Sequence, residues 1–337
     1  MRRNILTTLH DIQNLKRSFD SSGEPFLGPL ENLKGVWENL PGLPGRGWNM
    51  IALPFISPES QLDYRVLMNQ YNEILNVGFV DEGVPNRGVI RPLDENLNQK
   101  IATLDYQQTI KQILAEDMPV SDLAGNKGLP IHHEPGLWLH MLNFATDGSN
   151  IGRSGSVPHG NTFSALGKSD VISGPPVIPD IDVLPIGATR NIDSGYLQPY
   201  KFFRDNPLAG LFNILEPHEL LRKATPQNVK ETTIINVDTN TLSGGVLNIP
   251  FIIRHADATE MSSTFWIMEL EDEFETDGSP VFILQYMQVV MLEFFERFDG
   301  VPGDIKWPHV SFNTMRRARG QNQETLLKMA FERLNDF

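Results

Sequence analysis

A long apolar run near the carboxyl end, from Val281 to Leu292, constrains the fold more than any other feature of this sequence. Odd and even positions of the run are both mostly apolar, so a strand formed by it would need cover on both faces. A buried helix of the same length would show the same pattern. The strand is favoured because β-branched and aromatic residues are dense, and because Gly278, Ser279 and Pro280 mark the start of the run.

A second predicted strand begins at Trp307, after the turn-rich residues 299–304. Side chains alternate across a strand, so Trp307 and Ser311 would share one face with His309. If the protein has a reactive centre, we expect His309 to belong to it.

Similar short segments recur through the chain, separated by turns rich in glycine, proline and aspartate. Residues 64–79 also have helical spacing, but a strand is favoured because residues 81–83 look like a hairpin turn into the next strand. About ten short strands and few helices predict an all-β protein, an antiparallel up-and-down β-barrel rather than a parallel α/β enzyme. The other predicted strands lie in residues 51–55, 64–79, 84–90, 104–113, 128–140, 151–167, 232–237, 246–253 and 263–270.

Apolar residues at helical spacing indicate three helical segments. A helix is predicted over residues 4–19, a helical insertion over residues 196–223, and an amphipathic helix over residues 322–337 that packs on the barrel or on another subunit. The predicted parts of the chain are an N-terminal helix with its linker (residues 1–25), the barrel domain (26–317) and a C-terminal helix (318–337).

Charge and composition exclude several classes of partner and site. Lys and Arg total 28 against 42 Asp and Glu, a net charge of −14, which argues against nucleic acid or an anionic membrane as the main partner. With no cysteine, there is no disulfide, no thiolate nucleophile, and no zinc, iron–sulfur or haem site held by cysteine. No segment has the length of a signal-peptide core or a membrane span, so we expect a cytoplasmic protein.

Two further groups of residues could carry chemistry. His132 and Glu134 share one face of a predicted strand, where the carboxylate could fix the tautomer of the imidazole, but an ordinary structural pair would look the same. His159 lies between Pro158 and Gly160 and could simply hold a tight turn. The sequence has no glycine-rich phosphate loop, no nucleophile elbow and no zinc-ligand spacing.

Three motifs spread over the predicted barrel carry a family resemblance. They are Pro29, Leu30, Leu33, Gly35, Val36 and Trp37; then Pro130, Ile131, His132, Glu134, Gly136, Leu137 and Trp138; and finally His309, Val310, Arg316 and Arg317. With them the sequence resembles the nitrobindin-like haem proteins, and more closely a bacterial haem peroxidase group with a fatty-acid-binding-protein-like barrel. It departs from the nitrobindin pattern after Trp37, where alternating glycines are absent, and in the insertion and terminal helices.

The resemblance implies a haem b cofactor. His309 would be the proximal ligand and the one protein ligand of the iron, and Trp307, Trp37 and Trp138 would line the cofactor. A homo-oligomer could form through the terminal helices.

On the distal side of the haem, the resemblance leaves three candidates. Peroxide cleavage asks for a base and a cation, for which His159, His132 and Arg153 are available. The small ligand would be nitric oxide or a peroxide, and the activity that of a peroxidase or a peroxynitrite isomerase.

Two other functions remain open. The barrel could carry a fatty acid, a carotenoid or a similar apolar molecule without redox chemistry, with His309 as an ordinary core residue. It could also be a structural or assembly protein that uses its terminal helices, in which case side chains would fill the interior.

Overall fold

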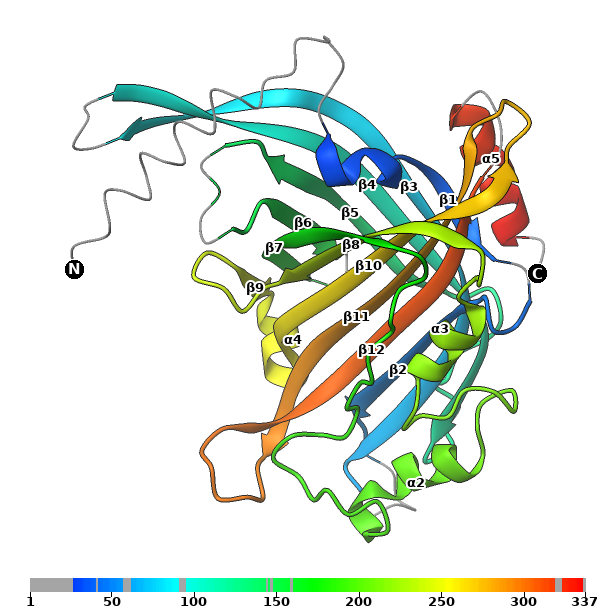
Figure 1. Cartoon of the computed structure of the whole chain (residues 1–337). Helices are drawn as coiled ribbons and strands as arrows, with labels where there is room; N and C mark the ends of the chain where they lie inside the picture. The colour runs from blue at the N-terminus through cyan, green and yellow to red at the C-terminus, as the bar shows by residue number, and fades with distance from the viewer. Residues whose placement is uncertain are drawn as a thin grey trace.

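The computed structural model describes residues 27–40, 42–56, 62–90, 95–143, 145, 148–157, 160–318 and 323–335. These residues form mostly β-structure (Figure 1). The strands are β1 (Gly35–Asn39), β2 (Gly47–Pro54), β3 (Tyr64–Ile90), β4 (Glu95–Met118), β5 (Pro130–Met141), β6 (Ile151–Val157), β7 (Asn161–Ser173), β8 (Val229–Asp238), β9 (Gly245–Asn248), β10 (Asp257–Phe274), β11 (Pro280–Glu296) and β12 (Asp304–Arg317).

Ten strand positions close into an antiparallel up-and-down barrel. From β2 to β8 each strand pairs with the next along the chain, and β10, β11 and β12 continue the order, while the short β9 pairs with β7. The strands β1 and β2 together occupy one of these positions, because each pairs with β3 on one side and with β12 on the other. This pairing joins the last strand to the first, and the predicted fold class is confirmed.

The apolar run of residues 281–292 lies in β11 and is covered on both faces. Phe282 and Leu284 belong to the apolar cluster inside the barrel, whereas Ile283 and Met287 belong to clusters on its outer surface. Two covered faces explain why this strand has no polar side.

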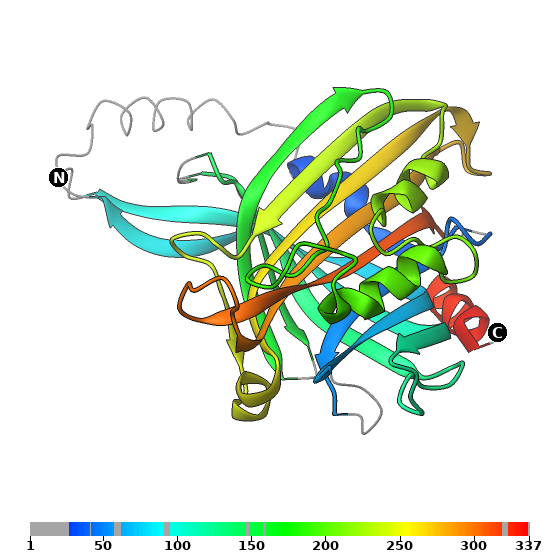
Figure 2. The same ribbon diagram turned by 90° about the horizontal axis from the view of Figure 1, so that it is seen from below.

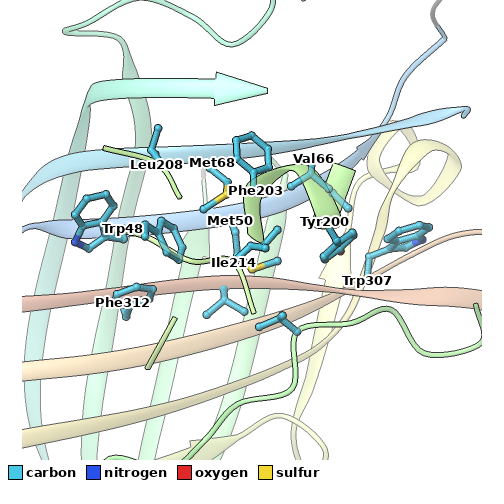
Figure 3. Close-up of a cluster of buried hydrophobic side chains, with 14 of the residues drawn as sticks. Trp48, Met50, Val66, Met68, Tyr200, Phe203, Leu208, Ile214, Trp307 and Phe312 are labelled. Atoms are coloured by element: carbon cyan, nitrogen blue, oxygen red, sulfur yellow. The ribbon is translucent and has the colours of Figure 1, made fainter. Parts of the chain in front are cut away.

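The chain between β7 and β8 forms a layer on the outside of the barrel (Figure 2). It contains the 3₁₀ turn η2 (Gly195–Leu197) and the helices α2 (Gln198–Asp205) and α3 (His218–Ala224), so the predicted helical insertion is confirmed. Its Tyr200 and Phe203 are buried with Trp48 and Phe312 of the barrel wall, in what we call the outer cluster (Figure 3).

One end of the barrel is closed by the 3₁₀ helix η1 (Gly28–Leu33). Leu30 and Leu33 pack into the inner apolar cluster with Trp37 and Trp138, and the Trp37 Nε1 donates a hydrogen bond to the Leu33 carbonyl at 2.8 Å. We call this the η1 end. The opposite end, where β12 begins, is called the open end.

The C-terminal helix α5 (Gln323–Asn335) lies outside the barrel wall. Its Leu326, Ala330 and Leu334 pack on Val36 of β1 and Ile74 of β3, so the predicted C-terminal amphipathic helix is confirmed. The helix predicted over residues 4–19 lies outside the described residues. In the part of the chain that the structure describes, no helix has both the length and the apolar character needed to cross a bilayer.

Two local predictions are wrong. Residues 81–83 do not form a hairpin turn, because residues 82 and 83 bulge opposite one residue of β4 and the strand runs on to Ile90. The strands β3 and β4 continue as an arm that projects beyond the barrel (Figure 1).

Residues 250–253 are not in a strand but in the helix α4 (Pro250–His255). Pro250 suits the first turn of a helix, since its φ is fixed and it has no N–H to donate to a sheet.

Candidate functional site

His309 faces the interior of the barrel. Its neighbours Val310 and Phe312 belong to the outer cluster beneath the insertion. Asn313 points the other way and donates from Nδ2 to Glu73 Oε2, on β3, at 2.9 Å. His309 and Asn313 are four residues apart on one strand, so they share a face.

Buried polar side chains cross the middle of the barrel, and those around Glu73 form what we call the Glu73 cluster. Gln108 Nε2 donates to Glu73 Oε1 at 2.8 Å, and both Tyr286 and Asn313 donate to Oε2. The hydroxyl of Tyr71 lies 2.9 Å from that of Tyr286. Burial raises the pKa of Glu73, and the hydrogen bonds from Tyr286, Gln108 and Asn313 oppose the rise. This carboxyl is therefore easier to protonate than an exposed glutamate.

A second group, the Glu134 cluster, surrounds a carboxylate on β5. Arg153 of β6 donates from Nη2 to Glu134 Oε1 at 2.8 Å, Tyr106 donates to the same oxygen, and His132 Nε2 lies 3.2 Å from Oε2. Burial alone would raise the pKa of Glu134, but the charge of Arg153 and the hydrogen bond of His132 lower that pKa to about 2. Glu134 is therefore ionised in ordinary buffers, and Arg153 matches its charge.

Arg153 is held firmly and is only 3% exposed. Besides Glu134, its Nη1 donates to Gln288 Oε1 at 2.7 Å and to Ser263 Oγ at 3.2 Å. Its guanidinium carbon also lies 5.2–5.3 Å from the centroids of four rings, those of Tyr106, Trp138, Phe163 and Phe265. The structure thus brings together three of the predicted site residues, namely His132, Arg153 and Trp138.

The inward-facing side chains around His309 are less buried than those in the middle of the barrel. His309, Asn49, Ser311 and Val290 all face inward, yet they are only partly buried, whereas Glu134 is fully buried. Asn49 Nδ2 lies 2.6 Å from His309 Nε2 and 2.8 Å from Ser311 Oγ. Solvent therefore reaches part of the inward-facing wall around His309.

The loop between β4 and β5 narrows the open end on one side. Gln112 Nε2 donates to the carbonyls of Ala124 and Asn126, both at 3.2 Å. Beneath the loop, Arg65 of β3 forms a buried ion pair with Asp117 of β4.

Two of the three predicted cofactor-lining tryptophans, Trp37 and Trp138, lie toward the other end of the barrel from His309. The ring of Trp307 stacks on Phe294, with centroids 4.9 Å apart, and contacts Tyr196 of the insertion. Trp37 is paired with Arg317, eight residues from His309 along β12, which corresponds to about 26 Å. Trp37 and Trp138 both belong to the apolar cluster toward the η1 end. The predicted distal residue His159 lies outside the described residues.

The sequence patterns did not identify most of the polar side chains inside the barrel, namely those of Asn49, Tyr71, Glu73, Tyr286 and Asn313. Each is a polar residue at an inward position of its strand, where inward positions elsewhere in the barrel are often apolar. That pattern could have marked them individually. Their contacts depend on the register of four strands, which the pattern does not contain.

The described residues contain no group of three or more histidine, aspartate or glutamate side chains that could hold a metal ion. No protein-family model matches the sequence, and the comparison with curated proteins found no match. Among solved structures, the crystal structure of Rv2717c from M. tuberculosis is similar. It is 15% identical, the alignment covers 88% of this chain and 99% of that chain, and the TM-score is 0.36. A likeness this weak carries no argument about function, and the nitrobindin-like resemblance stays a prediction.

Proposed function

We propose that the protein binds a small molecule inside the open end of its barrel, and that this molecule is haem held by His309. The observation that carries the proposal is the inward-facing, partly exposed imidazole of His309 on the barrel wall. A barrel of this size can enclose one small ligand.

The donor chemistry at His309 fits haem. The porphyrin supplies four nitrogen ligands, so one neutral imidazole from the protein suffices. Asn49 would have to release His309 Nε2, and it would keep its hydrogen bond to Ser311. The Glu73 and Glu134 clusters fill the middle of the barrel, so the ligand would remain above them, at the open end.

Bound haem would supply redox chemistry and a site for nitric oxide or peroxide. Of the distal candidates, Arg153 is held by Glu134, Gln288 and Ser263. The side chain of His132 is 22% exposed and remains accessible. We therefore propose His132 as the residue that would bind or move a proton if peroxide chemistry occurs.

One contact supports a second candidate, a carrier of an apolar molecule such as a fatty acid or a carotenoid. His309 Nε2, the nitrogen that iron would need, already lies 2.6 Å from Asn49 Nδ2. A carrier in which His309 only forms hydrogen bonds would keep this contact, with Val290 as part of the apolar wall.

A haemin titration followed by absorbance tests the proposal. We expect a shifted Soret band for the wild type, and an affinity at least about tenfold lower for His309→Ala because the axial ligand is lost. The matched control is His133→Ala, since His133 lies on the outer face of β5 near Gln107 and Thr109. A Soret band in His309→Ala that is unchanged from the wild type would refute His309 as the iron ligand. If no band forms and a fluorescent fatty acid binds, the carrier is supported.

A further inference from the structure

The segment that contains β9 and α4, residues 245–256, lies at the rim of the open end (Figure 1). It runs directly into β10, whose first residue Asp257 pairs with Glu293 near the end of β11. The segment is attached to the turn after β6, because the N–H of Ile249 donates to the carbonyl of Gly160 at 2.9 Å. We call residues 245–256 the rim segment.

The rim segment exposes apolar side chains while a polar side chain is turned inward. Asn248 of β9 donates from Nδ2 to the Asp257 carboxylate at 2.7 Å and to the Ala258 carbonyl at 2.8 Å. Its two neighbours in the extended chain, Leu247 and Ile249, point the other way, and both are exposed. This arrangement is the reverse of the usual one, in which the apolar face of a strand is covered and the polar face meets water.

The helix α4 continues this exposure. None of its six residues is buried, although the first four, Pro250 to Ile253, are apolar. Phe251 is 60% exposed, and Ile253 is exposed as well. Residues two apart in a helix lie on different sides of it, so α4 projects from the barrel instead of packing along it (Figure 1).

Four closely spaced side chains, those of Leu247, Ile249, Phe251 and Ile253, form what we call the rim patch. Single exposed apolar side chains are common on protein surfaces, but a group of them within seven residues marks an interaction site. The rim patch therefore needs a partner that is itself apolar.

The charge of this part of the chain suits the head groups of phospholipids. The sequence has 42 Asp and Glu residues, yet residues 239–256 contain none. Arg254 is exposed, its Nε donates to the carbonyl of Pro250 at 3.1 Å, and it forms no ion pair within the described ranges of the chain. A basic side chain beside exposed phenylalanine and isoleucine is typical of segments that lie at the interface of a bilayer.

A protein partner fits the rim patch less well than a lipid surface does. Four side chains are few compared with the ~20–30 residues that each side contributes to a stable protein–protein interface. A bilayer needs no matching surface, and each apolar side chain that enters it adds to binding.

We propose that the rim segment binds the surface of a zwitterionic phospholipid bilayer. The rim patch enters the boundary between head groups and acyl chains, and Arg254 contacts the lipid phosphates. The net charge of −14 favours a zwitterionic surface over an anionic one. Binding in this way turns the open end of the barrel toward the lipid, and it does not depend on what binds at His309.

Flotation of the protein with vesicles of palmitoyl-oleoyl phosphatidylcholine tests the binding. The wild type should float with the vesicles, and Phe251→Asp should bind them at least about tenfold more weakly, because a carboxylate replaces an apolar side chain that enters the bilayer. An aspartate in the first turn of a helix is favourable, so α4 should remain folded. Absence of the wild type from the floating fraction would overturn the proposal.

The matched control is Phe274→Asp, at the other end of β10. Phe274 is 64% exposed, close to the value for Phe251, but it lies away from the rim segment. This variant should bind the vesicles like the wild type. Equal binding by Phe251→Asp and Phe274→Asp would show that the rim patch is not the contact.

Tryptophan at the same two positions reports the location directly. The emission of a tryptophan moves to shorter wavelength when its ring leaves water, and the five native tryptophans are buried and common to both variants. Vesicles should therefore shift the emission of Phe251→Trp and leave that of Phe274→Trp unchanged. A shift in both variants, or in neither, would contradict insertion of the rim patch.

Size-exclusion chromatography with light scattering separates a lipid partner from a second copy of the chain. If the wild type fails to float but forms a dimer that Phe251→Asp converts to a monomer, the rim patch is a contact between two copies and the lipid proposal is wrong. His309→Ala should float like the wild type, and Phe251→Asp should retain haemin binding. The proposed lipid contact and the proposed haem site can therefore fail separately.

Discussion

Replacing Arg153 by methionine is expected to lower the free energy of unfolding by about 3–5 kcal/mol at pH 7, because it leaves a buried carboxylate without its counter-charge. Glu134 is fully buried, and its pKa of about 2 depends on Arg153 and His132. Gln288 and Ser263 would lose a hydrogen-bond donor as well. Urea denaturation of the variant and the wild type measures the difference.

The same pair of proteins should respond differently to acid. Glu134 has a lower pKa in the folded protein than the 4.5 of a free glutamate, so its contribution to stability is complete above pH 4.5 and is lost as the pH falls toward 2. The variant lacks most of this contribution. The difference in free energy of unfolding between the wild type and Arg153→Met should therefore narrow by about 2 kcal/mol as the pH falls from 5 to 3.

A double variant provides the control for Arg153. Glu134→Met together with Arg153→Met removes both charges, and it should recover much of the stability lost in Arg153→Met, since a buried ion pair can be replaced by apolar side chains at little cost. Two results would show that Arg153 does not compensate the charge of Glu134. One is a loss of stability below about 1 kcal/mol in Arg153→Met, and the other is a stability difference from the wild type that widens in acid.

Truncation of Phe212 to alanine is expected to cost about 3–5 kcal/mol, because it opens a cavity between the insertion and the barrel wall. Phe212 is fully buried, and its ring meets those of Trp48 and Phe312 edge-on, with both centroid distances at 5.4 Å. Thermal or urea denaturation measures the loss. Limited proteolysis should also show faster cleavage between residues 174 and 228.

The control for this truncation is Phe274→Ala, at the end of β10, where the side chain is 64% exposed. It should change stability by no more than about 0.5 kcal/mol. Equal effects of the two truncations would mean that the insertion is not anchored through Phe212.

The sequence was most informative for strands whose pattern of apolar and polar residues indicates which faces are covered. Residues 281–292 are apolar on both faces, and their many β-branched and aromatic residues favour a covered strand over a buried helix, so β11 could be predicted. The alternation around His309 likewise predicted its shared face with Ser311. Residues 81–83 were misleading because turn-forming residues can also be accommodated as a bulge in a long strand.

The polar interior could not be predicted because it depends on register. Glu73 is 213 residues from Tyr286 and 240 from Asn313 in the chain, yet all three are hydrogen-bonded. A shift of one residue in any strand pair would turn these side chains outward. The family resemblance implied that Trp37 and His309 line one site, whereas the strand pairing places Trp37 beside Arg317 at the end of β12, eight residues from His309.

The most direct test of a haem site at the open end is a ¹⁵N NMR spectrum of the histidine rings, recorded with and without haemin. Ferric haem is paramagnetic and broadens the signals of nuclei close to the iron. We predict that the ring signals of His309 disappear, while those of His255 on α4 persist. Persistence of the His309 signals when haemin is bound, with loss of those from His255, would contradict binding inside the barrel.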